Sequence, residues 1–189
     1  MAIVEIHPEP IHGPWTAGFV LDRHVIKSVP IGYLGEHMQF DTTRSALGEL
    51  VYQFKFKSGR IDDIGDTAVQ FVLATWPDID CIVAAPSSVT GSAHSALAVA
   101  GALAAALSIP RVVDAVIKNK TQAMKNVPPP DRAAILAQAI QPGPGSVAGR
   151  RVLLVDDLWQ TGATMRRVAE VITGMGATEI RALAMTRTK

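Results

Sequence analysis

The chain has 189 residues and a formal net charge of +1, with 48% hydrophobic and 19% charged residues. This length suits one domain with a single sizeable core, and the apolar content excludes a chain that is disordered by composition. The near-zero charge excludes a global field that attracts nucleic acid. We therefore expect no strong autonomous nucleic-acid binding, and any anion site must be local.

The chain lacks the features of a secreted or membrane protein. The segment Met1 to Pro10 has no basic start and no apolar core of the signal-peptide type. The stretch Ala93 to Leu107 is too short and too rich in alanine to span a bilayer. The single cysteine, Cys81, lies in an apolar run and is expected to be a buried thiol. We expect a cytoplasmic protein with no membrane partner.

The N-terminal region predicts a β-hairpin followed by an irregular extension. Ala2–Ile6 and Thr16–Leu21 are typical of short strands, separated by the turn Pro8–Pro14. Val25–Phe40 contains proline and glycine and is expected to be irregular. We predict a single domain over residues 1–189, in which residues 1–40 form this hairpin and extension.

The rest of the chain predicts helices and strands in alternation. Apolar residues at helical spacing indicate a helix from an N-cap at Asp41 to about Phe56 and another from Asp62 to Trp76. The later strands are expected at Ile79–Ala85, Arg111–Ile117, Arg151–Val155 and Glu179–Met185, the helices at Ser92–Leu107, Asp131–Ala139 and Ala163–Met175, and a turn region at Gln141–Gly149. This alternation predicts an α/β fold with a mostly parallel sheet flanked by helices.

One segment carries the chemistry. The strand from Arg151 ends in Asp156 and Asp157, the loop Leu158–Gly162 follows, and a helix starts near Thr164. Ligands of open α/β sheets bind beyond the carboxyl ends of the strands. Unpaired N–H groups and the helix dipole there suit a phosphate, and paired carboxylates can accept from ribose hydroxyls or help to hold a hydrated Mg²⁺.

Two other phosphate chemistries are excluded. A receiver domain also carries an aspartate pair after an apolar strand, but it needs a further aspartate downstream, and no aspartate follows Asp157. No Gly-x-x-x-x-Gly-Lys sequence occurs, so a Walker loop is absent as well.

The segment from Val152 to Thr164, Val-Leu-Leu-Val-Asp-Asp-Leu-Trp-Gln-Thr-Gly-Ala-Thr, resembles the diphosphate-sugar signature of type I phosphoribosyltransferases. The resemblance implies that Asp156 and Asp157 hold ribose hydroxyls and, directly or through water, Mg²⁺. It also implies that the segment Gln160, Thr161, Gly162, Ala163 and Thr164 wraps the 5′-phosphate. Trp159 and Gln160 depart from the small residues usual in the family.

A looser similarity points to the ComF-like, competence-associated branch of that family. It rests on Leu50 to Gly59, with its aromatic-Lys-aromatic end, on Lys118 to Gln122, and on Asp131-Arg132. The chain has neither the cysteine zinc module often found in that branch nor its Arg-Gly-Phe-Asn turn. At the place of that turn the chain has Pro86 to Ser92.

The resemblance implies further site residues, each with a simpler interpretation beside it. The turn with Ser87 and Ser88 would grip diphosphate through its amides, or it is a plain turn with Ser92 as helix N-cap. Lys118 and Lys120 would supply positive charge, with Lys118 acting beside the two aspartates in catalysis, or they are solvated loop lysines. Residues 118–130 would form a mobile hood, with Arg132 in it or at a helix start.

Several other residues are expected to have ordinary structural roles. Lys55 and Lys57 should point in different directions on a helix, and a surface role is expected for both. The five histidines have no metal-ligand spacing. Trp15, Tyr33 and Tyr52 are expected in the core, with an acceptor pocket as the other interpretation.

These features predict Mg²⁺-dependent transfer of phosphoribose between diphosphate and a base or amine acceptor, with phosphoribosyl diphosphate or a nucleotide as ligand. The alternative is a non-catalytic sensor of phosphoribosyl diphosphate or nucleotides, which the missing arginine-rich turn favours. A scaffold for DNA uptake or repair is a weaker third hypothesis. The sequence leaves the acceptor and a homodimer open.

Overall fold

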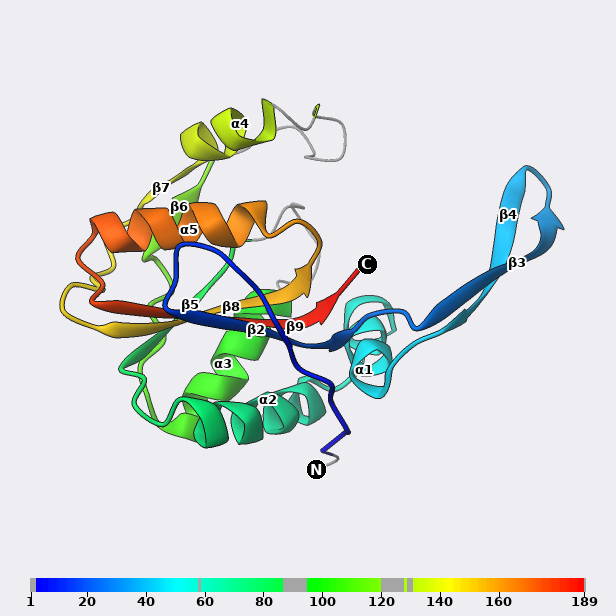
Figure 1. The fold of residues 1–189 in the computed structure, drawn as a ribbon, viewed down its shortest axis with the longest axis horizontal. Coiled ribbons are helices and arrows are strands. Elements are labelled where there is room, and N and C mark those ends of the chain that lie inside the picture. The colour runs from blue at the N-terminus through cyan, green and yellow to red at the C-terminus, as the bar shows by residue number, and fades with distance from the viewer. Residues whose placement is uncertain (1–2, 58, 87–94, 120–127, 129–130, 189) are drawn as a thin grey trace.

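A computed structural model describes residues 3–57, 59–86, 95–119, 128 and 131–188 (Figure 1). The strands are β1 (Glu9–Pro10), β2 (Ala17–Arg23), β3 (Lys27–Leu34), β4 (His37–Thr43), β5 (Cys81–Ala84), β6 (Val116–Lys118), β7 (Ile140–Pro142), β8 (Arg151–Trp159) and β9 (Glu179–Arg187). The helices are α1 (Ala46–Phe56), α2 (Ile61–Thr75), α3 (Ser95–Leu107), α4 (Arg132–Ala139) and α5 (Ala163–Gly174).

The main sheet of the described region has the strand order β1-β2-β9-β8-β5. Strands β2, β9, β8 and β5 run parallel, and β1 pairs antiparallel with β2. The predicted α/β fold, a mostly parallel sheet of the phosphoribosyltransferase type with an N-terminal hairpin, is confirmed. The carboxyl ends of β2, β9 and β8 meet at one edge of the sheet.

Both faces of the sheet are covered, which explains the nearly continuous apolar runs of its strands. Helices α1, α2 and α3 cover one face, and α4 and α5 lie over the other (Figure 1). In β8, Leu153 and Val155 pack into the core on the α1–α3 side, whereas Val152 and Leu154 pack into the core on the α5 side. The strand thus alternates between two apolar layers.

The first strand of the N-terminal hairpin differs from the prediction. The strand that pairs with β2 is Glu9–Pro10, and not the expected residues 2–6. Val4 and Ile6 instead pack against the core on the α1–α3 side, and the Val4 amide donates to Thr67 Oγ1 at 3.3 Å. Burial against α2 therefore replaces the expected strand pairing.

The expectation of an irregular segment over residues 25–40 is wrong. Strands β3 and β4 form a long antiparallel hairpin that projects from the body of the molecule (Figure 1). The glycines that suggested irregularity have local roles: Gly35 has a positive φ of 62° at the hairpin turn, and Gly32 follows a bulge.

Helix α1 begins later than predicted. Its N-cap is Ser45, whose Oγ accepts from the Gly48 amide at 2.9 Å, whereas Asp41 lies in β4. Ser45 Oγ also donates to the Arg23 carbonyl at 2.5 Å, which ties the helix start to the end of β2. The second predicted helix, over residues 62–76, agrees with α2 to within one residue.

The predicted strand over residues 111–117 does not form as one unit. Arg111 makes an isolated bridge to Ile82, and the chain then turns into β6, which pairs with β7 in a separate sheet. The expected turn region after residue 140 therefore begins with a strand. Gly143 packs so closely on the Asp114 carbonyl that a Cβ there would overlap it, which fixes this turn.

The structure ends β8 four residues later than predicted, at Trp159. Hydrogen bonding of Leu158 and Trp159 to β9, opposite Thr186 and Arg187, accounts for the extension. Among the helices of the described residues, none combines the length and apolar character that a membrane crossing requires.

Candidate functional site

The Asp156-Asp157 pair lies near the carboxyl end of β8, inside the main sheet between β9 and β5. Helix α5 begins at Ala163, with Gly162 as its N-cap. The connecting loop is therefore residues 160–162, shorter than the expected loop from Leu158, because β8 continues to Trp159. The two carboxylates and the helix start are brought close together by this short connection.

Asp157 is held by two residues from other elements. Lys55 Nζ at the end of α1 lies 2.5 Å from Asp157 Oδ2, and the Ser95 hydroxyl of α3 donates to the same oxygen. The residue is 9% exposed. Burial alone would raise the pKa of Asp157, but the Lys55 ammonium and these hydrogen bonds lower it below its usual range. Asp157 is therefore a stabilised carboxylate.

Asp156 has the opposite electrostatic character. Burial, followed by the negative charge of Asp157, raises its pKa well above the usual range. Its Oδ1 accepts from the Asp157 amide at 2.9 Å. Lys118 of β6 lies near enough to interact with it electrostatically: burial lowers the pKa of Lys118, and Asp156 opposes that shift. Lys118 thus lies within electrostatic range of Asp156, although its strand belongs to a separate sheet.

Lys55 and Ser95 are site residues that the sequence analysis did not identify. The expected surface role of Lys55 is wrong, although it does point away from Lys57, which lies 5.6 Å from the Tyr52 ring. Helical spacing gave the difference in direction between the two lysines. It could not show which helix end packs beside β8, because that depends on how α1 crosses the sheet.

The loop after β8 is shaped by Trp159. Gly162 has a positive φ of 71°, and a Cβ at this position would overlap the Trp159 ring. That ring is buried and packs edge-to-face against Trp15 with centroids 5.9 Å apart. Trp159, which departs from the family pattern, therefore has a packing role: its indole ring packs against the turn at Gly162.

The loop and the first turn of α5 offer hydrogen-bond donors. Gln160 and Thr161 are exposed, while Ala163 and Thr164 are half-buried. The first amides of a helix lack intrahelical partners, and the positive end of the dipole lies there. Arg166 adds a cation, and its Nη1 donates to the Thr161 carbonyl at 2.5 Å. This arrangement can bind an anionic oxygen group.

Some of the predicted site residues lie outside the described part of the structure. These are Ser87, Ser88 and Lys120, together with the remainder of the Pro86–Gly91 turn after Pro86 and most of the predicted hood over residues 118–130.

A metal site made of protein groups alone is not present in the described residues, which contain no cluster of three or more His, Cys, Asp or Glu side chains suited to a metal. Asp156 and Asp157 nevertheless supply hard carboxylate oxygens at the sheet edge. Mg²⁺ commonly binds through one or two carboxylates together with substrate phosphates. The donor set therefore fits an Mg²⁺ shared with a diphosphate ligand.

A family model described as "Phosphoribosyl transferase domain" matches residues 84–187, more than half of the chain. The chain belongs to this family. The matched region contains β8, the loop, α5 and both aspartates, and the carboxyl side of β5. A comparison with curated proteins finds no significant match.

Solved structures of phosphoribosyltransferases are also similar. A purine phosphoribosyltransferase from Pyrococcus horikoshii is 24% identical over 68% of this chain and 83% of its own, with a TM-score of 0.45. Glutamine phosphoribosylpyrophosphate amidotransferase from B. subtilis, complexed with ADP and GMP, is 22% identical over 76% of this chain and 28% of its own, with a TM-score of 0.48. A hypoxanthine phosphoribosyltransferase from Staphylococcus aureus is 12% identical over 68% of this chain and 63% of its own, with a TM-score of 0.45. The ComF-like branch stays a prediction.

Proposed function

We propose that this phosphoribosyltransferase domain binds phosphoribosyl diphosphate with Mg²⁺ and transfers phosphoribose between diphosphate and a base or amine acceptor. The observation that carries the proposal is the end of β8. There, the two aspartates are followed within a few residues by a glycine turn and a helix start. Asp156 and Asp157 would bind the ribose hydroxyls, and residues 160–164 would bind the 5′-phosphate.

Lys55 and Ser95 prepare Asp157 for this role. Together they keep its buried carboxylate ionised, and an ionised carboxylate accepts stronger hydrogen bonds than a neutral one. Both of these interactions use Oδ2, and the Asp156 carboxyl is a further hydrogen-bond partner of the Asp157 carboxylate. A ribose hydroxyl would therefore bind at the pair of carboxyl groups rather than at Oδ2. The ion pair also fixes the position of the carboxylate before ligand binds, which reduces the cost of ordering it.

The transfer step needs charge stabilisation rather than a covalent nucleophile. The acceptor nitrogen forms a bond to ribose C1 while the bond from C1 to the diphosphate oxygen breaks. Diphosphate leaves with that bonding pair, and the nitrogen releases its proton to water. Lys118, which interacts electrostatically with Asp156, would offset charge that develops on the leaving diphosphate. Lys120 and the amides around Ser87 and Ser88 would act at the same group.

Mg²⁺ would be held by Asp156 and Asp157, directly or through water, together with diphosphate oxygens. When bound, it would neutralise part of the diphosphate charge. In the same site the ammonium of Lys55 balances the charge of Asp157, so the protein itself already supplies one cation.

The test is diphosphate release from phosphoribosyl diphosphate across a panel of bases and amines, with binding measured in parallel by calorimetry. Changing Lys118→Ala together with Lys120→Ala should lower turnover at least tenfold while weakening affinity less, because these lysines act most strongly on the departing group. Lys27→Ala, on the projecting hairpin, is the control and should change neither. Tight binding without release for any acceptor would instead support the non-catalytic sensor.

A further inference from the structure

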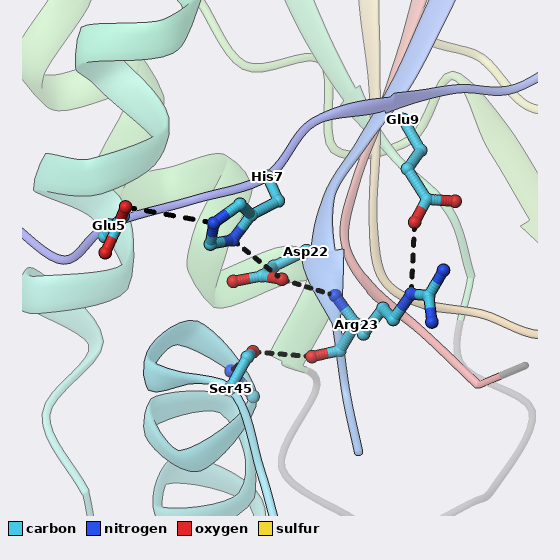
Figure 2. A network of polar contacts seen from close by, with 7 residues as sticks. Glu5, His7, Glu9, Asp22, Arg23 and Ser45 are labelled. Carbon is cyan, nitrogen blue, oxygen red and sulfur yellow. Dashed lines mark hydrogen bonds and ion pairs between the residues drawn. The ribbon is translucent and has the colours of Figure 1, made fainter. Parts of the chain in front are cut away.

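A pocket of about 440 Å³ lies at the carboxyl end of β2, between the N-terminal segment and the start of α1. Its volume falls in the range of small-molecule sites. Its lining combines polar and charged side chains, several of which Figure 2 shows in contact with one another, with the apolar residues Ile26 and Ala46. Its ionisable side chains are Glu5, His7, Glu9, Asp22, Arg23 and Arg44.

The pocket shares an edge of the sheet with the proposed ribose site. Asp22 pairs with Thr186 of β9, which pairs in turn with Leu158 of β8, next to Asp157. Neighbouring strands are separated by about 4.8 Å, so Asp22 lies about 10 Å from Leu158 across the sheet. Both sites therefore lie at the carboxyl edge of the main sheet.

One carboxylate of the pocket is fully engaged by protein groups. Glu9 receives Arg23 Nε at 3.2 Å and Arg187 Nη1 at 2.7 Å, one on each carboxylate oxygen. The hydrogen bond from Arg23, opposed by burial and supported by Arg187, lowers the pKa of Glu9. Both oxygens of Glu9 are therefore occupied by guanidinium groups, and Glu9 is not the acceptor that a ligand would use.

Asp22 is different, because it is buried but incompletely paired. Its side chain is 5% exposed. Asp22 Oδ1 accepts from the Arg23 amide at 2.7 Å and lies 3.7 Å from His7 Nδ1. Asp22 Oδ2 has no hydrogen-bond partner among the described residues, and Figure 2 shows this oxygen pointing away from both neighbours. Because Asp22 lines the pocket, this oxygen can accept a hydrogen bond from a ligand that supplies a donor.

The charges around Asp22 favour a donor rather than an anion. Glu5 lies across His7 from Asp22, with its Oε1 3.8 Å from His7 Nε2. Arg44, the other cation of the wall, is partly engaged: its Nη1 lies 3.4 Å from Glu49 Oε2 and its guanidinium stacks on Tyr52 at 3.7 Å, while its buried Nε has no hydrogen-bond partner among the described residues. With Arg23 and Arg187 paired to Glu9 and Arg44 to Glu49, the ionisable groups that lie nearest the Asp22 carboxylate are the His7 imidazole and, beyond it, the Glu5 carboxylate.

We propose that this pocket binds the acceptor and selects one that donates N–H groups, such as an amine or an amino-substituted nitrogen ring, over rings that carry a carboxylate. The inference rests on the proposed function, because it places the acceptor beside a ribose held at Asp157. Asp22 Oδ2 accepts from the acceptor N–H, and Glu5 and Asp22 together repel a ligand carboxylate.

Calorimetry on the full chain can test this selection with adenine and cytosine as amino-bearing probes and orotate and nicotinate as carboxylate-bearing ones. The wild type should bind an amino-bearing base at least tenfold more tightly than either carboxylate. Asp22→Asn, which keeps the shape and the acceptor oxygen for the Arg23 amide, should weaken that binding about tenfold through loss of a charge-assisted bond. Glu5→Gln, at an exposed position, should reduce the difference in affinity between the amino-bearing and the carboxylate-bearing probes. Asp41→Asn on β4 is the control.

Preferred binding of a carboxylate ring, binding of no probe, or unchanged affinity in Asp22→Asn would each overturn the inference. Titration with phosphoribosyl diphosphate and Mg²⁺ is run on the same wild-type sample. If phosphoribosyl diphosphate does not bind, the result contradicts the proposed function itself. If it binds but the acceptor probes are not distinguished, the result contradicts only the assignment of this pocket.

Discussion

At the scale of single residues, the pairing of Lys55 with Asp157 is the contact on which the site depends. We expect Lys55→Met to lower the free energy of unfolding by about 1.5–3 kcal/mol, because it leaves a buried carboxylate short of a charged partner. Urea unfolding at pH 7 measures the change. Lys57→Met, two positions away and directed toward Tyr52, is the matched control and should cost much less. Equal effects would show that the ion pair contributes little.

Gly162 is the second residue whose substitution should have a specific effect on stability. Gly162→Ala places a Cβ against the buried Trp159 ring at a positive φ, so the turn must shift or strain by about 1–3 kcal/mol. Gly174→Ala is the control, because a Cβ there meets open space. Thermal unfolding should show a clear loss for the first variant and none for the second. We also expect weaker phosphate binding for Gly162→Ala, and an undisturbed turn would contradict this account.

At the scale of elements, the β3–β4 hairpin is separable from the body. None of its residues belongs to either core cluster, and Lys27 lies opposite Thr43 at its base. Replacing residues 28–42 with Asn-Gly should therefore move Tm by no more than about 3 °C. For comparison, Leu47→Ala in the buried start of α1 should lower the free energy of unfolding by about 2–5 kcal/mol. A large loss of Tm on deleting the hairpin would show that it supports the fold.

The start of β8 is tied to the segment before β5 by a pH-dependent contact. Two side-chain hydrogen bonds from Arg151, followed by its backbone amide, hold the pKa of Asp80 at about 2, from an ordinary value of 3.8. This lowered pKa gives stability above about pH 4 that is lost as the pH falls through about 2. In urea unfolding, Asp80→Asn should be less stable than wild type at pH 6, and the difference should shrink toward pH 2. A constant difference would contradict the assignment; Asp62→Asn is the control.

At the scale of the whole molecule, the sequence predicted the parts of the fold that local patterns determine. Strands β5, β8 and β9 are buried on both faces, so their apolar runs were visible without knowledge of the fold. The signature after Val155 was visible for a different reason: its carboxylates, its turn and the start of its helix are neighbours in sequence. The glycines near residue 35 were misleading, since glycine signals a tight hairpin turn as well as an irregular loop.

The rest of the site depends on contacts between distant segments. Ser95 lies 62 residues before Asp157, and Lys55 reaches the same carboxylate from helix α1, which follows β2 in the chain. The pairing of β2 with β9 brings Asp22, and His7 beside it, to the sheet edge at which β8 ends. No periodicity or motif encodes these encounters, so the electrostatics of the two aspartates could not be predicted from the sequence.

The most direct test of the central claim is calorimetry with phosphoribosyl diphosphate and Mg²⁺ on the wild type and on the double variant Asp156→Asn with Asp157→Asn. Each aspartate contributes charge-assisted hydrogen bonds of about 1.5–3 kcal/mol. We therefore expect the wild type to bind and the double variant to lose at least a hundredfold in affinity while remaining folded. Unchanged affinity in a folded double variant would contradict the assignment of this sheet edge as the phosphoribosyl diphosphate site.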